Sequence, residues 1–138
     1  MSGAHHRVVI VGTGFSGLGM AIRLKQEGHD DFVLLERADD IGGTWRDNTY
    51  PGCRCDVPSH LYSFSFAPNP GWSATFSPQP EILQYLRGCA ERHGLLPHVR
   101  FDHELLGADW DEGEARWRLD TSQGELTADV VIAGQGPL

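Results

Sequence analysis

The chain has 138 residues, of which 40% are hydrophobic and 22% charged, a composition typical of one ordinary globular domain. Its formal net charge of −8 is opposite to the basic footprint of nucleic-acid-binding proteins and disfavours acidic membrane surfaces. No apolar run approaches the ~20 residues of a membrane span, and residues 1–7 lack the apolar stretch of a secretory signal. We therefore expect a cytoplasmic protein with no nucleic-acid or membrane partner.

The N-terminal third predicts a βαβ unit. Residues 7–11 and 32–35 are short continuous apolar runs, which suit buried parallel strands. A glycine-rich turn at 12–17 follows the first run, and helical apolar spacing then continues to Glu27. Gly28 is placed to terminate this helix.

The remainder predicts a long loop, a second helix and more strands. Residues 39–80 are rich in proline, glycine and aromatic residues, and a loop of this length usually carries function. Helical spacing covers residues 79–94. Alternating segments near 99–101, 108–110 and 117–119 predict an antiparallel meander, and 129–133 is another buried strand. The fold class expected is α/β, with three layers, a parallel sheet and an antiparallel β-meander.

The glycine-rich turn has the pattern of a dinucleotide-binding fingerprint. Gly12 permits a tight turn, Gly14 allows close approach of a pyrophosphate, and Gly17 allows the helix to pack on the strand. The helix N-terminus adds free N–H groups and positive potential. Glu36, at the end of the second strand, is expected to accept hydrogen bonds from ribose hydroxyls and to repel a 2′-phosphate. FAD or NAD is therefore expected here rather than NADP.

The three cysteines give no sign of a metal site or a disulfide framework. Their number is odd, and no secretory signal accompanies them. Cys53 and Cys55 form a C-x-C without a second ligand pair at zinc spacing. We expect no metal and interpret these cysteines as small packing residues.

Residues 42–56 carry a second, longer motif. Gly-Gly-Thr-Trp is followed after four residues by Tyr-Pro-Gly and then, after three more, by Asp56. This pattern resembles the fingerprint of Baeyer–Villiger monooxygenases, which are class B flavoproteins. The resemblance runs from about Arg7 to the last residue, with Gln135 as a modest departure from the family pattern.

The resemblance implies an FAD-dependent, NADPH-using monooxygenase that inserts one oxygen atom from O₂ into a ketone through a C4a-peroxyflavin. It implies that Asp56 and Arg54 are catalytic, Asp56 beside the flavin and Arg54 near the nicotinamide cofactor. The turn at 50–52 is expected to point both inward. The residues expected to bind cofactor are Gly12, Gly14, Phe15, Ser16, Gly17, Glu36, Arg37, Gly43, Thr44, Trp45, Asp56, Tyr62, Leu105 and Gly134.

By the same resemblance, residues 1–138 are the N-terminal part of an FAD-binding domain whose fold is incomplete relative to the family. The NADPH domain and the C-terminal completion of the sheet are expected outside this chain. Three alternatives remain open: a flavin-dependent N- or S-oxygenase, a nicotinamide-binding dehydrogenase domain, and a truncated, non-catalytic FAD-binding module.

Overall fold

The computed structural model describes residues 2–136, with side chains from residue 4 onward. In chain order the elements are β1 (Ser2–Val11), α1 (Phe15–Gln26), β2 (Phe32–Leu35), α2 (Thr44–Asp47), the 3₁₀ turn η1 (Ser59–Leu61), α3 (Gln79–Arg92), the 3₁₀ turn η2 (Leu96–His98), β3 (Val99–Arg100), β4 (Leu105–Asp111), β5 (Arg116–Thr121) and β6 (Gly124–Ala133).

One six-stranded sheet runs in the order β3-β2-β1-β6-β5-β4. The neighbouring strands β3, β2, β1 and β6 pair in parallel, and Val9 of β1 lies opposite Val33 of β2 and Val131 of β6. β6, β5 and β4 then pair antiparallel. The predicted combination of a parallel sheet with a meander is thereby confirmed. β1 and β6 are longer than their apolar runs, because their pairing continues back to the start of each strand.

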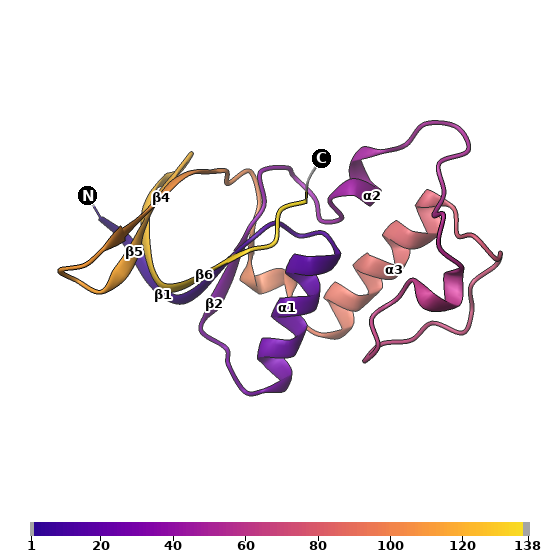
Figure 1. The fold of residues 1–138 in the computed structure, drawn as a ribbon, viewed down its shortest axis with the longest axis horizontal. Helices are drawn as coiled ribbons and strands as arrows, with labels where there is room; N and C mark the ends of the chain where they lie inside the picture. The colour runs from indigo at the N-terminus through magenta and orange to yellow at the C-terminus, as the bar shows by residue number, and fades with distance from the viewer. Residues whose placement is uncertain (1, 137–138) are drawn as a thin grey trace.

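Each face of the parallel strands has its own core. Ile10 and Leu34 lie on the face covered by α1 and α3, and both are fully buried. Val9 and Val33 point to the opposite face, where residues of β5 and β6 cover them. The buried strand β2 therefore needs apolar residues at every position, as its sequence Phe-Val-Leu-Leu provides. Figure 1 shows α2 and α3 toward one end of the molecule, α1 near its middle and the β4–β5 hairpin at the other end.

The predicted place of the strand near residue 99 is wrong. Val99 and Phe101 were expected in the meander, but β3 pairs parallel with β2 at the opposite edge, with Val99 beside Leu34. Short alternation does not distinguish a parallel edge strand from an antiparallel one. The preceding helix α3 makes the crossover that a parallel connection requires.

The long aromatic loop is ordered by its own backbone pairing. The Cys55 N–H donates to the carbonyl of Ser77, and the Gln79 N–H donates to the carbonyl of Cys53, both at 2.9 Å. Phe64 stacks on Phe66 with ring centroids 5.0 Å apart. The aromatic residues of this loop pack against the core cluster formed with α1 and α3. Part of the aromatic content therefore covers the helical side of the core.

Candidate functional site

The turn between β1 and α1 has the close backbone packing that its glycines predict. Gly12 has a φ of 98°, which disfavours other residues. A Cβ on Gly17 would collide with the carbonyl oxygen of Gly12, so the start of α1 packs directly on the turn. A Cβ on Gly14 would meet only the Cα of Gly43, at 3.8 Å. The backbone at Gly14 is therefore open to an approaching group.

This turn opens onto a cavity of about 710 Å³. That volume falls within the roughly 300–1,000 Å³ typical of ligand sites. The cavity is bounded by the glycine-rich turn, the end of β2, α2, the start of β4 and the end of β6. The predicted cofactor residues that line it are Gly12, Gly14, Phe15, Ser16, Glu36, Arg37, Gly43, Thr44, Trp45, Tyr62, Leu105 and Gly134.

The N-terminus of α1 borders this cavity and has no acidic side chain of its own. Its N-cap is Gly14, no side chain caps the helix, and its first turn carries no acidic residue. The orphan N–H groups and the positive end of the helix dipole therefore remain for an anion. Ser16 donates its hydroxyl to the carbonyl of Gly134 at 2.8 Å, which ties the helix to the end of β6.

Glu36 lies at the end of β2 with only 4% of its surface exposed. Thr13 donates its hydroxyl to Oε1 at 2.5 Å, and the Ala38 N–H donates to Oε2 at 2.9 Å. The guanidinium of Arg46 lies 3.3 Å from Oε2. The carboxylate is thus held in place at the cavity wall by donors from three segments.

α2 carries the aromatic wall of the cavity. The indole N–H of Trp45 donates to the Tyr62 hydroxyl at 3.0 Å, and the two rings meet edge to face. Phe15 also contacts Tyr62 edge to face, with ring centroids 4.9 Å apart. Burial raises the pKa of Tyr62, the hydrogen bond from Trp45 opposes this shift, and the charge of Asp56 adds to it. The hydroxyl therefore stays protonated at neutral pH.

Leu105 and His103 both line the cavity. The His103 N–H donates to the carbonyl of Glu36 at 2.9 Å, which joins this segment to the end of β2. Its ring nitrogen Nε2 lies 2.8 Å from the Thr121 hydroxyl. Burial lowers the pKa of His103, and the positive charge of Arg100 adds to the effect.

The side chains that follow the Tyr-Pro-Gly turn alternate between solvent and the core. Arg54 and Asp56 are exposed, and neither lines the cavity, whereas Cys53 and Cys55 point inward and are buried. The extended backbone at 53–56 alternates its side chains, and the apolar thiols occupy the core side. Arg54 instead approaches the carbonyl of Phe76 at 3.4 Å.

Two further glycines act through the backbone. The N–H of Gly42 is bonded to the carbonyl of Thr13 at 3.0 Å, which ties the second motif to the glycine-rich turn. Gly17 is buried beneath the turn and shapes the cavity without lining it. Sequence reasoning missed Thr13, Arg46 and His103, of which Thr13 lies inside the glycine fingerprint.

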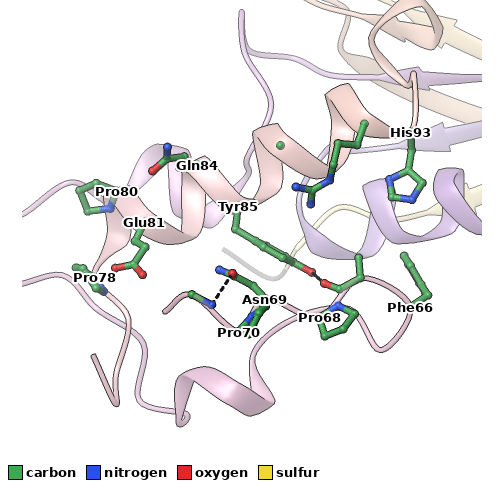
Figure 2. A pocket seen from close by; sticks show the side chains of 14 residues that line it. Phe66, Pro68, Asn69, Pro70, Pro78, Pro80, Glu81, Gln84, Tyr85 and His93 are labelled. Atoms are coloured by element: carbon green, nitrogen blue, oxygen red, sulfur yellow. Dashed lines mark hydrogen bonds between the residues drawn. The ribbon is translucent and has the colours of Figure 1, made fainter. Parts of the chain in front are cut away.

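A second hollow, of about 1070 Å³, lies between residues 66–71 and α3. Figure 2 shows Tyr85 extending from α3 toward the 66–71 segment, where its hydroxyl donates to the carbonyl of Ala67 at 2.6 Å. This hollow is larger than the first, but none of the predicted cofactor residues lines it. We therefore place the candidate site at the glycine-rich turn.

Within residues 2–136, no group of three or more His, Cys, Asp or Glu side chains is placed to hold a metal ion. In the same part of the chain no helix has the length and apolar character needed to cross a membrane.

Comparison with known families agrees with this geometry. Residues 10–87, more than half of the chain, match the NAD(P)-binding Rossmann-like domain family. The chain belongs to this family. Among curated proteins, the Rossmann-like chain is 60% identical over 134 residues to a Baeyer–Villiger monooxygenase of Streptomyces coelicolor. It is 52% identical over 135 residues to one of Pseudomonas aeruginosa. Each match covers 97% of this chain and 26% of the relative, so the chain spans about a quarter of their length.

Solved structures give the same result for this Rossmann-like chain. A steroid monooxygenase bound to NADP superposes with a TM-score of 0.91 at 40% identity. An open form of cyclohexanone monooxygenase superposes with a TM-score of 0.92 at 34% identity. Each covers 97% of this chain, and 26% and 27% of the respective monooxygenase. The resemblance to Baeyer–Villiger monooxygenases that the sequence predicts is confirmed.

Proposed function

We propose that this chain forms the FAD-binding part of a flavin-dependent, NADPH-using monooxygenase of the Baeyer–Villiger type, which inserts one oxygen atom of O₂ into a ketone. The observation that carries the proposal is the single cavity shared by the glycine-rich turn, Glu36 and the aromatic wall of α2. A relative named FAD-binding monooxygenase, from Aspergillus terreus, is 42% identical over 139 residues and supports the choice of cofactor.

The residues present fit an FAD molecule. Gly14 lacks the side chain that would stand in the path of a pyrophosphate, and the N-terminus of α1 supplies its donors. Glu36 is a hydrogen-bond acceptor for the adenosine ribose. Trp45 and Tyr62 offer an apolar wall with one hydroxyl for a flavin ring. FAD, when bound, would supply the redox and oxygen chemistry, while these residues bind it, orient it and exclude water.

Asp56 and Arg54 remain proposed catalytic residues of the whole enzyme. Both are exposed, and the charge of Asp56 acts on the Tyr62 hydroxyl. In this proposal they meet the nicotinamide cofactor and the small-molecule substrate from outside the cavity. The proposal also includes a cytoplasmic location, expected from the sequence.

Titration of the purified chain with FAD, followed by quenching of flavin fluorescence, tests the proposal. We expect saturable binding near one FAD per chain, with NAD binding much more weakly. Preference for NAD would favour the dehydrogenase alternative, and absence of both would refute a dinucleotide site. In the whole enzyme, NADPH consumption with a ketone, an amine or a sulfide would separate the Baeyer–Villiger reaction from N- or S-oxygenation. FAD binding without any such consumption would indicate a non-catalytic module.

A further inference from the structure

Arg46 is the one basic side chain of α2, and it reaches back to the end of β2. Its Nη1 atom lies 3.3 Å from Oε2 of Glu36, and the exposed fractions of the two side chains are only 14% and 5%. Both residues line the 710 Å³ cavity. The ion pair therefore connects the helix that carries the aromatic wall to the carboxylate at the ribose end.

The guanidinium has little freedom to move. Its Nε and Nη2 donate to the two carboxylate oxygens of Asp47 at 2.8 and 2.9 Å, a bidentate arrangement. Nη1 also donates to the carbonyl of Asp40 at 2.8 Å. The hydrogen bond with Asp47 raises the pKa of Arg46, and the charge of Glu36 adds to this shift, while burial opposes it. Arg46 is thus a fixed positive charge facing Glu36.

The donors around Glu36 leave limited room for a ligand. A carboxylate offers about four lone-pair sites. Thr13, Ala38 and Arg46 approach three of them, so about one remains for a hydroxyl in the cavity. Without Arg46, one of the two oxygens would lose a partner, and the carboxylate would be free to rotate or to take up a different bond.

We propose that Arg46 is a positioning residue that aims the Glu36 carboxylate at the ribose 2′-hydroxyl of the bound adenine dinucleotide, and so sets selectivity for the adenosine half of the cofactor. This inference rests on the proposed function, because it assumes a dinucleotide in the cavity. An arginine that only anchored α2 would predict a different result: its loss would weaken all adenine nucleotides equally.

The test compares ADP with 2′-deoxy-ADP by calorimetry, using the wild-type chain and Arg46→Met. A hydrogen bond to a charged group gives the wild type a preference for ADP of about tenfold or more. We expect Arg46→Met to reduce this ratio to about twofold or less, while circular dichroism shows a folded chain. Arg23→Met is the matched control, because Arg23 is exposed and pairs with Glu27 on α1. It should keep the wild-type ratio.

Arg46→Lys keeps a cation opposite Glu36 and should recover part of the preference, which also covers the case in which the methionine variant does not fold. Three results would overturn the inference. The wild type could show no preference for ADP over 2′-deoxy-ADP, Arg46→Met and Arg46→Lys could both keep the full wild-type ratio, or Arg46→Lys could show no higher ratio than Arg46→Met. An ADP preference without FAD binding would refute the FAD proposal and leave the role of Arg46 standing. FAD binding with an unchanged ratio in the Arg46 variants would refute the role of Arg46 and leave the FAD proposal standing.

Discussion

Trp45 donates its indole N–H to the hydroxyl of Tyr62 at 3.0 Å, across 17 residues of an irregular loop. Trp45 is buried, with 9% of its surface exposed. The bond fixes α2 against the aromatic loop and so sets the wall of the cavity. Its partners come from separate motifs of the sequence, and the structure brings them together on one side of the candidate site.

Tyr62→Phe should lower the free energy of unfolding by about 1–3 kcal/mol, because it leaves a buried donor without its acceptor. Urea unfolding followed by circular dichroism measures this loss. The matched control is Tyr50→Phe, since Tyr50 is 63% exposed, and a surface change of this kind usually stays within about 0.5 kcal/mol. Equal losses in the two variants would contradict a stabilising role for the Trp45–Tyr62 bond.

Alanine substitutions at two glycines of the turn should have separate effects. Gly17→Ala places a methyl group against the Gly12 carbonyl, a rigid backbone contact, and should destabilise the chain by about 1–3 kcal/mol or more. Gly14→Ala has space for its Cβ and a φ of −80°, so folding should be retained. Its methyl group stands at the approach to the N-terminus of α1, and FAD binding should therefore weaken.

Urea unfolding and FAD titration of both variants check this separation. The expected pattern is a large loss of stability only in Gly17→Ala and a loss of affinity without loss of stability in Gly14→Ala. A Gly14→Ala variant that binds FAD as tightly as the wild type would show that the pyrophosphate does not approach this point of the turn.

His103 predicts a pH dependence of stability. Burial lowers its pKa in the folded chain below the ordinary value of about 6.5. Between these two pKa values the unfolded chain binds more protons than the folded chain, so the free energy of unfolding rises with pH. The stability associated with a neutral His103 in the folded chain is fully present above about pH 6.5, and it is lost as the pH falls toward the pKa of the folded chain.

Urea unfolding of the wild type and of His103→Gln at a series of pH values from 7.5 to about 5 measures this contribution. The wild type should lose stability toward acid more steeply than the variant, whose glutamine does not titrate. The same slope in both proteins would assign the acid sensitivity to other groups.

The sequence predicted correctly those features whose physical rule involves residues close together in the chain. Gly17 and Glu36 follow from a fingerprint whose turn, helix start and strand end lie within one βαβ unit. The contact between Arg46 and Glu36 depends on how residues 37–43 fold back, and no spacing rule describes that path. The strand at Val99 was misplaced because alternation is shared by both pairing directions. The inward face of residues 53–56 required knowing which side meets the core.

The orientation of residues 53–56 gives a direct chemical prediction. Cys53, Cys55 and Cys89 are free thiols, and their exposed fractions are 9%, 5% and 0%. A thiolate must reach its reagent to react, so these thiols should react slowly with a disulfide reagent such as dithiobis-nitrobenzoate in the folded chain. In urea, all three should react rapidly, giving three equivalents of the coloured product.

Cys53→Ser and Cys55→Ser, examined singly, assign the response. Each should lower the total in urea by one equivalent and leave the slow native reaction in place. Two rapidly reacting thiols in the native wild type, lost one at a time in these variants, would mean that Cys53 and Cys55 face solvent. The alternation of side chains at residues 53–56 would then be reversed, and Arg54 and Asp56 would have to be placed on the inner side of this segment.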